Sequence, residues 1–250
     1  MAVDDLARRG FGSGADRYHR ARPSYRPEVM AYLGDALGLG PGVRVLDLAA
    51  GTGHMTVRLV ELGAHVSAVE PSEAMRAVCA ETVPGVAVVA GTAEDIPFAA
   101  ESFDAVVVAQ AFHWFDGPAA LREIARVLRP GGGLALLWNE RDGATAFDVA
   151  VGKALAWSKP LPYDVRHDFT ADLDASGHFG AARARQFPWA ERLSHEQQLA
   201  RVSTISYINA MPPDARRDVL DRLRGLLADQ PDPRDVGHVT NTFVATKPGT

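Results

Sequence analysis

The residues best suited to bind a ligand or do chemistry are two acids and two glycines in a short stretch of the chain. Asp47 precedes Gly51 and Gly53, and Glu70 follows Gly51 by 19 positions. Two glycines after a strand let the backbone turn sharply and approach a ligand, and an acid at the end of the next strand can accept hydrogen bonds from both hydroxyls of a ribose. Because roughly 20 residues typically separate such an acid from the loop, the pattern predicts a site for a ribose-containing ligand.

Asp47 and Thr56 bear on which ribose-containing ligand is expected. In a dinucleotide-binding loop a third glycine would fall where this chain has Thr56. The Asp47 carboxylate, at the tip of a strand, repels a pyrophosphate and attracts an ammonium or a sulfonium. The sequence therefore favours a cationic ligand over a dinucleotide. A purely structural role for Asp47, as a helix cap or a partner of the glycine loop, stays open.

A second group of candidates follows the apolar run at residues 103–109. His113 comes four residues after this run, at the carboxyl end of the sheet where ligands bind in open α/β folds. Histidine can take a proton from a hydroxyl at neutral pH, so His113 is a candidate general base; the alternative is that it packs on the ligand or fixes the loop. Trp114 and Phe115 either wall an apolar acceptor pocket or belong to the core.

Polar side chains at two further places are candidates for contacting an acceptor. Arg22 is flanked by Tyr18 and Tyr25 and has the fork geometry that clamps a carboxylate. Asn139 and Arg141 follow the fifth predicted strand, again at the ligand edge of the sheet. For all of these residues, solvation at the surface or termination of a strand is the alternative interpretation.

The elements that must position these residues alternate between apolar runs and helical patterns. Strands are predicted at 43–48, 66–69, 86–90, 103–109 and 134–138, and helices at 27–39, 51–62, 72–82 and 118–128, with a tight turn at 129–133. Continuous apolar strands separated by helices indicate a parallel sheet that is covered on both faces.

The two ends of the chain have weaker patterns. The glycines of residues 1–25 predict little regular structure there. Beyond residue 140, helices are predicted at 144–157, 194–210 and 213–227. Strands are predicted at 183–187 and 239–246, as a hairpin-like pair that closes the sheet.

The composition excludes several other kinds of chemistry. The chain has 250 residues, a net charge of −5 and one cysteine, Cys79. An intrachain disulfide and a cysteine-rich zinc site are ruled out, and no histidine stands at metal-ligand spacing from an acid or cysteine. The acidic balance argues against a basic nucleic-acid surface, and no apolar stretch reaches the roughly 18 residues that cross a membrane. We expect a soluble cytoplasmic protein without metal, nucleic-acid or membrane partners, and the sequence does not fix its oligomeric state.

Five motifs, in order along the chain, resemble those of class I S-adenosylmethionine-dependent methyltransferases. They stand at residues 46–53 (LDLAAGTG), 69–72 (VEPS), 91–98 (GTAEDIPF), 102–115 (SFDAVVVAQAFHWF) and 128–132 (LRPGG). The opening residues 15–25 are similar to the lid of small-molecule members, including the trans-aconitate-methyltransferase-like group. The resemblance implies an α/β fold: a seven-stranded, mostly parallel, doubly wound Rossmann-like sheet with an N-terminal lid and a C-terminal helical insertion.

The resemblance also implies a cofactor, S-adenosylmethionine, and the residues that hold it. Gly51 would line its methionine part, and Glu70 would hold its ribose hydroxyls. Thr92 stands where many relatives carry an aspartate for the adenine amino group, so Glu94 or Asp95 is expected to replace that contact. The full set of implied cofactor residues is Tyr18, Asp47, Ala49, Gly51, Gly53, His54, Glu70, Pro71, Ser72, Thr92, Ala93, Glu94 and Gln110.

The function implied is methyl transfer to a small-molecule acceptor by in-line displacement, with oxygen as the expected acceptor atom and carbon or nitrogen as alternatives. His113 would be the catalytic base. The expected acceptor contacts are Arg22, Tyr25, Trp114, Asn139 and Arg141. One domain is expected: 1–40 as lid and helix, 41–140 as cofactor-binding core, and 141–250 as substrate-side helices and closing strands.

Two other functions stay open. The first is a nicotinamide-dependent oxidoreductase, which is disfavoured by Asp47, by Thr56 and by the lack of a Tyr-x-x-x-Lys pair, since Tyr163 is followed at four by His167. The second is a protein of the methyltransferase fold that binds the cofactor without methylating, because a cofactor motif says nothing of turnover.

Overall fold

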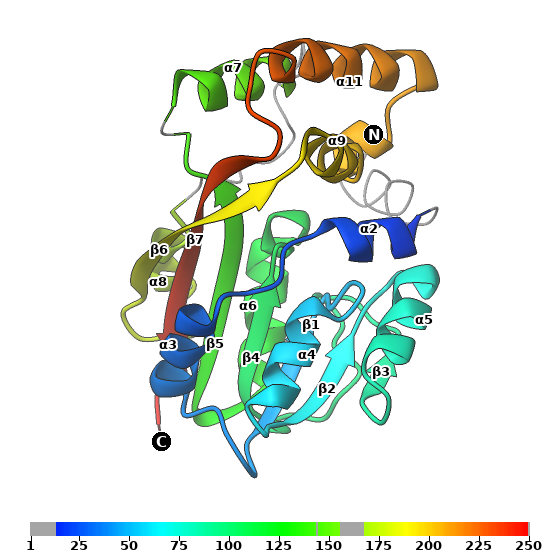
Figure 1. Cartoon of the computed structure of the whole chain (residues 1–250). Helices are drawn as coiled ribbons and strands as arrows, with labels where there is room; N and C mark the ends of the chain where they lie inside the picture. Colours follow the sequence, from blue (N-terminus) through cyan, green and yellow to red (C-terminus); the bar gives the residue numbers. More distant parts are fainter. Residues whose placement is uncertain (1–13, 144, 156–167, 250) are drawn as a thin grey trace. The chain divides into compact units, whose positions relative to one another are not determined.

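One sheet organises the chain. The computed structural model describes residues 14–143, 145–155 and 168–249. Within them, seven strands form a sheet in the order β3-β2-β1-β4-β5-β7-β6 (Figure 1). The strands are β1 (Arg44–Leu48), β2 (His65–Val69), β3 (Ala87–Val89), β4 (Phe103–Ala109), β5 (Leu128–Arg141), β6 (Arg183–Leu193) and β7 (Arg234–Thr246). The predicted α/β class with a seven-stranded sheet is confirmed.

The pairing of the strands is parallel except at β7. Asp47 in β1 lies opposite Ala68 in β2 and Val107 in β4, and both pairs are parallel. By contrast, the Gly131 N–H donates to the carbonyl of Lys247 and the Asp142 N–H donates to the carbonyl of Gly237, so β7 runs antiparallel to β5. The loops that follow β1, β2 and β4 therefore lie at the same edge of the sheet.

The chain divides into two compact units by its internal contacts. Unit 1 comprises Met1–Pro23, Asn139–Tyr163 and Pro188–Thr240, and unit 2 comprises Ser24–Trp138, Asp164–Phe187 and Asn241–Thr250. Strands β5, β6 and β7 each contribute residues to both units. The predicted single domain with its three stretches stays a prediction.

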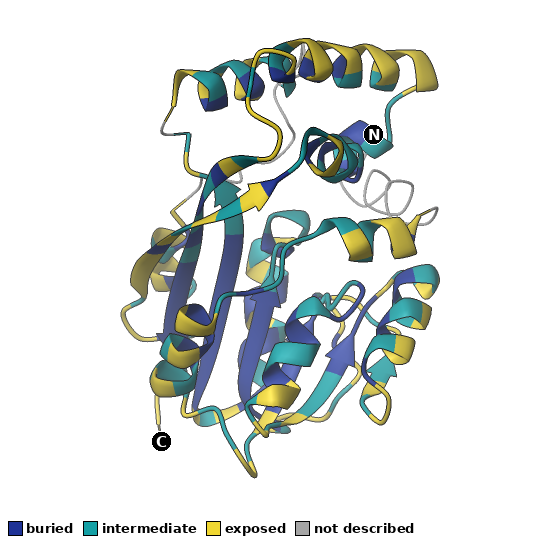
Figure 2. Ribbon diagram, viewed as in Figure 1, coloured by how far each residue is buried: buried dark blue, intermediate teal, exposed yellow. Residues whose placement is uncertain are grey.

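Alternate side chains of the central strands in unit 2 enter two hydrophobic clusters. Val45 and Val107 pack with side chains of α3 and α4, whereas Leu46 and Val106 pack with side chains of α6. Since successive strand residues point to opposite faces, helices cover both faces of the sheet. The helices of unit 2 are α3 (Pro27–Leu37), α4 (His54–Glu61), α5 (Glu73–Thr82), α6 (Gly117–Val127) and α8 (Thr170–Ala175), with a short 3₁₀ helix η1 at Phe112–Trp114. Figure 2 shows the buried strands between the partly exposed helices.

Local chemistry explains where the helices of unit 2 begin and end. The side chains of Ser72 and Asp116 accept hydrogen bonds from the backbone of the first turns of α5 and α6. These caps satisfy N–H groups that have no partner within the helix. Gly38 ends α3 in the left-handed conformation at φ 64°. The prediction of a helix from residue 51 is wrong by three residues, because Gly53 precedes α4 with a φ of 89°.

The glycine run before residue 134 is part of β5 and not the predicted turn that precedes it. Phe103 pairs with Leu128 and Ala105 pairs with Gly133, so β5 holds extra residues in a bulge. Gly131 has a φ of 77°, and a Cβ at Gly133 would overlap the side chain of Leu37. Gly131 thus suits the left-handed backbone of a bulged strand, and the absence of a side chain at Gly133 leaves room for Leu37 of α3.

Unit 1 has its own hydrophobic cluster. Its helices are α2 (Ala15–Ala21), α7 (Ala146–Leu155), α9 (His195–Ser203), α10 (Ser206–Asn209) and α11 (Pro213–Leu227). Val151, Val202 and Leu223 are fully or almost fully buried and bring α7, α9 and α11 together. This cluster is separate from those of unit 2.

Several elements that lie wholly or partly in unit 1 differ from the prediction. The sequence predicts a single helix at 194–210, but the structure has two helices, because α9 ends at Ser203. The Thr204 hydroxyl donates to the carbonyl of Arg201, and the backbone of Ile205 is extended. Helix α2 forms where little regular structure was expected, and it begins directly after Gly14. Strands β6 and β7 are longer than predicted and reach into unit 1. Residues 144, 156 and 157 of the predicted helix 144–157 lie outside the described residues.

Candidate functional site

The loop after β1 has the backbone conformation that the glycines predict. Gly51 and Gly53 have φ values of 58° and 89°, and Ala49, which has a side chain, also has a positive φ of 60°. A non-glycine residue in this region is strained, and such strain is concentrated at functional sites. The Ala50 N–H donates to the carbonyl of Val69 at 3.0 Å, which ties the loop to the end of β2.

The two glycines are needed for different reasons. A Cβ built on Gly51 meets no heavy atom within 4 Å, so the space beside it is open to a ligand. A Cβ on Gly53 would come within 3.1 Å of the Cys79 sulfur on α5. Gly51 therefore keeps the loop accessible, and Gly53 lets α4 approach α5.

Replacing Gly53 with alanine should destabilise unit 2 by roughly 1–3 kcal/mol, through backbone strain and the contact with Cys79. Gly85→Ala is the matched control, because Gly85 has a φ of 90° and no heavy atom within 4 Å of its built Cβ. Urea unfolding of both variants separates the two causes. An equal loss in the two variants would show that the Cys79 contact contributes nothing.

The Glu70 carboxylate holds the glycine loop against the end of β2. Its two oxygens accept from the N–H groups of Gly51 at 2.9 Å and Ser72 at 2.8 Å. Burial raises the pKa of Glu70, while these two hydrogen bonds and the nearby Arg76 oppose the shift. Each carboxylate oxygen has two lone pairs, so Glu70 keeps acceptor capacity for two hydroxyls of a ligand.

Asp47 is a fully buried acid with one bonded oxygen. The Thr56 hydroxyl on α4 donates to its Oδ2 at 2.6 Å, whereas Oδ1 has no partner among the described residues. Burial, with a smaller contribution from the charge of Glu70, raises the pKa of Asp47 to about 7. This bond ties Asp47 to a side-chain hydroxyl of α4, whereas the cap of that helix is Gly53 and has no side-chain hydrogen bond. A buried carboxylate oxygen without a partner is costly, so Oδ1 is the notable feature of this acid.

Cys79, beneath the glycine loop, is not an activated nucleophile. Burial and the neighbouring Asp47 raise the pKa of its thiol to about 11. The thiolate is the reactive form of cysteine, so this side chain is inert at neutral pH.

The other predicted cofactor residues of unit 2 lie in the loops after β2, β3 and β4, except His54, which is the first residue of α4. Ala93 is buried, Thr92 is exposed, and Glu94 accepts from the Asp116 N–H at 2.9 Å. Gln110 ends β4 with a positive φ of 63°. Pro71 is exposed and His54 and Ser72 are half-buried. Their predicted contacts to a cofactor stay predictions.

An aromatic group surrounds His113. Its Nδ1 accepts from the indole N–H of Trp138 at 3.0 Å, and burial lowers its pKa to about 4. The ring of Trp114 lies 5.1 Å from that of His113, and Trp138 stacks on Phe169 at 4.3 Å. Trp138 was expected only as the last residue of a strand, and nothing in the sequence signalled its bond to His113.

The predicted acceptor contacts are divided between the two units. Trp114 and Tyr25 belong to unit 2, where Tyr25 is buried in the cluster around α3. Arg22, Asn139 and Arg141 belong to unit 1, as does the predicted cofactor residue Tyr18. The Arg22 guanidinium lies over the Tyr18 ring at 4.8 Å.

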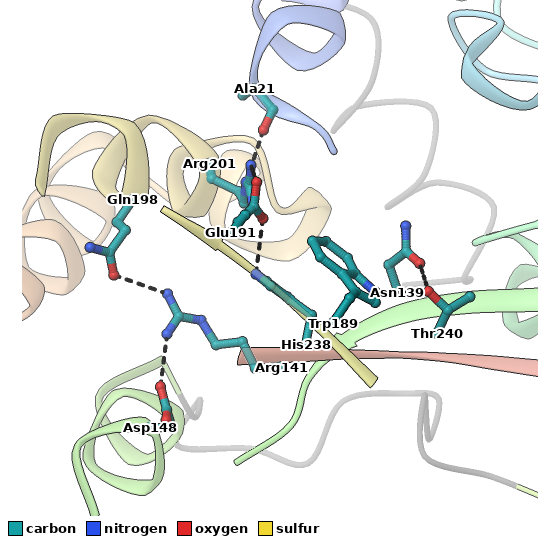
Figure 3. A network of polar contacts seen from close by, with 10 residues as sticks. All are labelled: Ala21, Asn139, Arg141, Asp148, Trp189, Glu191, Gln198, Arg201, His238 and Thr240. Atoms are coloured by element: carbon teal, nitrogen blue, oxygen red, sulfur yellow. Dashed lines mark hydrogen bonds and ion pairs between the residues drawn. The ribbon is translucent and has the colours of Figure 1, made fainter. Parts of the chain in front are cut away.

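In unit 1, Asn139 and Arg141 are part of a polar network that Figure 3 shows. Arg141 donates to Asp148 at 3.2 Å and to Gln198 at 3.4 Å, and Asn139 accepts from the hydroxyl of Thr240 at 2.6 Å. Arg141 is thus already paired with a carboxylate.

A second part of the same network joins Glu191, Arg201 and His238. Glu191 accepts from two guanidinium nitrogens of Arg201 and lies 3.0 Å from His238 Nε2 (Figure 3). Burial works in the opposite direction, but the close contact with His238 and the hydrogen bonds from Arg201 lower the pKa of Glu191 to about 2. The sequence gives no periodic or motif signal for partners so far apart, and this network was not predicted.

Replacing Arg201 with methionine should destabilise unit 1 by about 1–2 kcal/mol at pH 7. The substitution removes the positive charge that offsets the cost of burying the Glu191 carboxylate. Since the folded pKa of Glu191 is lowered, the pair stabilises the protein above about pH 4.5 and its contribution fades as pH falls towards 2. Urea unfolding at pH 7 and pH 4 measures this change. Arg222→Met, at an exposed position of α11, is the control and should have little effect. A loss that does not shrink at pH 4 would contradict the electrostatic explanation.

Among the described residues, no group of three or more His, Cys, Asp or Glu side chains is placed to hold a metal ion. In the same part of the chain, none of the helices has both the length and the hydropathy of a membrane span.

The sequence is similar to a known protein family and to a curated relative. Residues 46–136 match the family described as Methyltransferase domain. An uncharacterized methyltransferase of Mycobacterium tuberculosis is 40% identical over 224 residues, which cover 88% of this chain and 86% of the relative.

Two solved structures share the fold at low sequence identity. Phosphoethanolamine N-methyltransferase 2 of Haemonchus contortus, in complex with phosphomonomethylethanolamine and S-adenosylhomocysteine, has a TM-score of 0.60 and 19% identity, over 99% of this chain and 60% of that one. The [4+2]-cyclase SpnF has a TM-score of 0.58 and 19% identity, over 92% of this chain and 85% of that one.

The glycine loop, the acid after β2 and the sheet order agree with the family match and with a relative that aligns over most of the chain. On this basis, the chain belongs to the class I S-adenosylmethionine-dependent methyltransferases.

Proposed function

We propose that this chain binds S-adenosylmethionine at the loops after β1 and β2 of unit 2 and transfers its methyl group to a small-molecule acceptor, with oxygen as the acceptor atom. The observation that carries the proposal is the pair of buried carboxylates beside an open glycine. Glu70 has spare lone pairs, Asp47 has an oxygen without a partner among the described residues, and Gly51 leaves room for a ligand.

The residues present fit this cofactor. Asp47 would stabilise an ammonium, and Glu70 would accept from two ribose hydroxyls. Ser72 and Ala93, in the loops after β2 and β3, would flank the adenine. A pyrophosphate would instead face two buried acids, which disfavours a nicotinamide dinucleotide.

When bound, S-adenosylmethionine supplies an activated methyl group on a sulfonium. The task left to this chain is therefore alignment and the exclusion of water. The residues after β4 would form the acceptor side, because β4 pairs with β1 and its following loop lies at the same edge of the sheet. Alignment alone can contribute on the order of 7–11 kcal/mol to such a step in favourable cases.

Calorimetry and label transfer test the proposal separately. Binding of S-adenosylhomocysteine, with no binding of NAD⁺, is the expected calorimetric result; the reverse would contradict it. Incubation with methyl-labelled S-adenosylmethionine and a metabolite extract should then label a small molecule. Binding without any label transfer would favour a member that uses the fold for a different reaction, as the cyclase with the same fold illustrates.

A further inference from the structure

One ion pair on α6 holds the loop that follows β3. The Arg126 guanidinium donates to the carbonyl oxygens of Ile96 at 2.9 Å and Phe98 at 2.8 Å. The same guanidinium donates to both carboxylate oxygens of Glu123 at 2.8 Å, and Glu123 accepts from the Ile96 N–H at 3.2 Å. Three backbone polar groups of residues 96–98 are thus paired with two side chains of one helix.

The loop depends on such bonds because residues 90–102, between β3 and β4, form neither a helix nor a strand. Its backbone groups must find partners outside regular secondary structure. A Cβ on Gly91 would come within 2.7 Å of the Pro97 ring, so the two ends of the loop are packed together. The Glu94 carboxylate accepts from the N–H of Asp116, the cap residue of α6. Helix α6 therefore holds this loop at two places.

The pair of Glu123 and Arg126 differs from an ordinary ion pair on a helix surface. Exposed charges three residues apart contribute little to stability. Asp221 and Arg224 on α11 are such a pair, with side chains that are 60% and 56% exposed, whereas the Glu123 side chain is 16% exposed. The hydrogen bond from Arg126 lowers the pKa of Glu123, so the carboxylate is ionised at neutral pH. It can then hold the planar guanidinium in the orientation that reaches both carbonyls.

This loop lies at the edge of the sheet where ligands bind. Strands β1, β2 and β3 are parallel neighbours, so the loops that follow them share that edge. Ala93, which is proposed to flank the adenine, is buried in the same hydrophobic cluster as Ile96 of the loop and Ile124 of α6. Because Ala93 and Ile96 are three residues apart and pack in one cluster, a displacement of residues 96–98 would also move Ala93.

We propose that Glu123 and Arg126 are positioning residues for the base of the cofactor. They fix the backbone of the loop after β3 and so set how strongly the protein prefers adenine to other purines, without contacting the ligand. This inference rests on the proposed function and deepens it. It gives α6 a part in cofactor recognition that is separate from the ribose contact proposed for Glu70.

Adenosine and inosine test the proposal, because they share the ribose and differ in the hydrogen-bonding groups at N1 and C6 of the base. Calorimetry of the unaltered protein should show tighter binding of adenosine. Arg126→Met should reduce this preference by about three- to tenfold, the equivalent of one hydrogen bond. Arg224→Met, which removes an ion pair of the same spacing on α11, should leave it unchanged. A general loss of stability weakens both nucleosides equally and leaves their ratio as it was, so an unchanged ratio in Arg126→Met would overturn the proposal.

A double variant, Glu123→Arg with Arg126→Glu, separates positioning of the loop from ion pairing. It keeps opposite charges at the two positions but places carboxylate oxygens against the carbonyls of Ile96 and Phe98. We expect it to lose the adenosine preference at least as fully as Arg126→Met, and we expect the Ile96 amide to exchange with solvent faster in both. A double variant with the preference of the unaltered protein would overturn the proposal.

Arg126→Lys keeps the positive charge but not the planar fork. It should lose the adenosine preference in smaller measure and supplies the same test if the other variants do not fold; an undiminished preference would contradict the proposal. Failure of S-adenosylhomocysteine and of both nucleosides to bind the unaltered protein would instead refute the proposed function. Binding of these ligands together with an unchanged ratio in the variants would refute only the role of Glu123 and Arg126.

Discussion

Replacing Asp47 with asparagine is expected to weaken the binding of S-adenosylhomocysteine by about 30- to 1000-fold, or roughly 2–4 kcal/mol. The variant keeps the shape of the side chain and its bond to Thr56 but removes the buried charge that would face the ligand's ammonium. Calorimetry measures the change. 5′-Methylthioadenosine, which lacks the amino-acid part, is the matched ligand, and its affinity should be the same in both proteins. An equal loss for both ligands would show that the variant disturbs the loop and not a charge pair.

The same residue predicts how cofactor affinity depends on pH. Because the pKa of Asp47 is raised to about 7 in the free protein, an ammonium must bind to a carboxylate that is partly protonated at neutral pH. As pH increases towards 7, the affinity for S-adenosylhomocysteine should therefore rise by up to about tenfold per pH unit. Above pH 7 it should level off, because Asp47 is then already ionised and no proton has to leave on binding. Asp47→Asn should lose most of this dependence between pH 5.5 and 7.5. A wild-type affinity that is flat over this range would contradict the assignment.

Asp47→Asn should also stabilise the ligand-free protein at pH 8. An acid whose folded pKa lies above its unfolded value lowers stability as pH rises from about 4 to 7, and the full penalty is present above 7. The substitution removes an ionisation penalty of about 2–4 kcal/mol from the free energy of unfolding, and the buried amide that replaces the acid costs about 1–3 kcal/mol. The free energy of unfolding should therefore increase by on the order of 1 kcal/mol. Urea unfolding at pH 8 and pH 5 checks this, with Asp35→Asn as an exposed control. The gain should disappear at pH 5.

Replacing Glu70 with alanine is expected to weaken adenosine binding by roughly 1.5–3 kcal/mol, or about 10- to 150-fold, because two charge-assisted hydrogen bonds to the ribose are lost. The carboxylate also holds the N–H groups of Gly51 and Ser72, so part of any effect could come from the loop. 2′,3′-Dideoxyadenosine separates the two causes: its weaker binding should be nearly unchanged by the substitution. If both nucleosides lose the same affinity, Glu70 supports the loop and does not contact the ribose.

Much of unit 2 could be predicted from the sequence because its signals are local. The apolar run of β4 and the helical pattern of α5 are each contained in a few consecutive residues, and both elements were predicted. The capping role of Ser72 was not predicted, because the sequence pattern included it as the first residue of that helix. The glycine run before residue 134 was misread as a turn, because its meaning depends on Leu37, far away in the sequence. Glycines that admit a neighbouring helix and glycines that end a strand have the same sequence pattern.

The chemistry of the candidate site was less predictable than its location. The sequence placed Asp47, Glu70 and His113 at the ends of strands, but the direction of a hydrogen bond depends on partners from other elements. Trp138 is 25 residues from His113, and Glu191 is 10 residues from Arg201 and still farther from His238. Single-sequence patterns carry periodicity and short motifs, and they contain no record of which distant polar groups meet.

The division of the chain also has a consequence for how such enzymes diverge. All of the matched family region, residues 46–136, falls inside unit 2, whereas unit 1 is assembled from three separate segments. Transferring unit 1 between relatives by recombination would need three separate grafts, and three of their junctions would fall inside β5, β6 and β7. Point substitution is the simpler route, so differences between relatives in unit 1 are expected to accumulate residue by residue rather than by the transfer of a module.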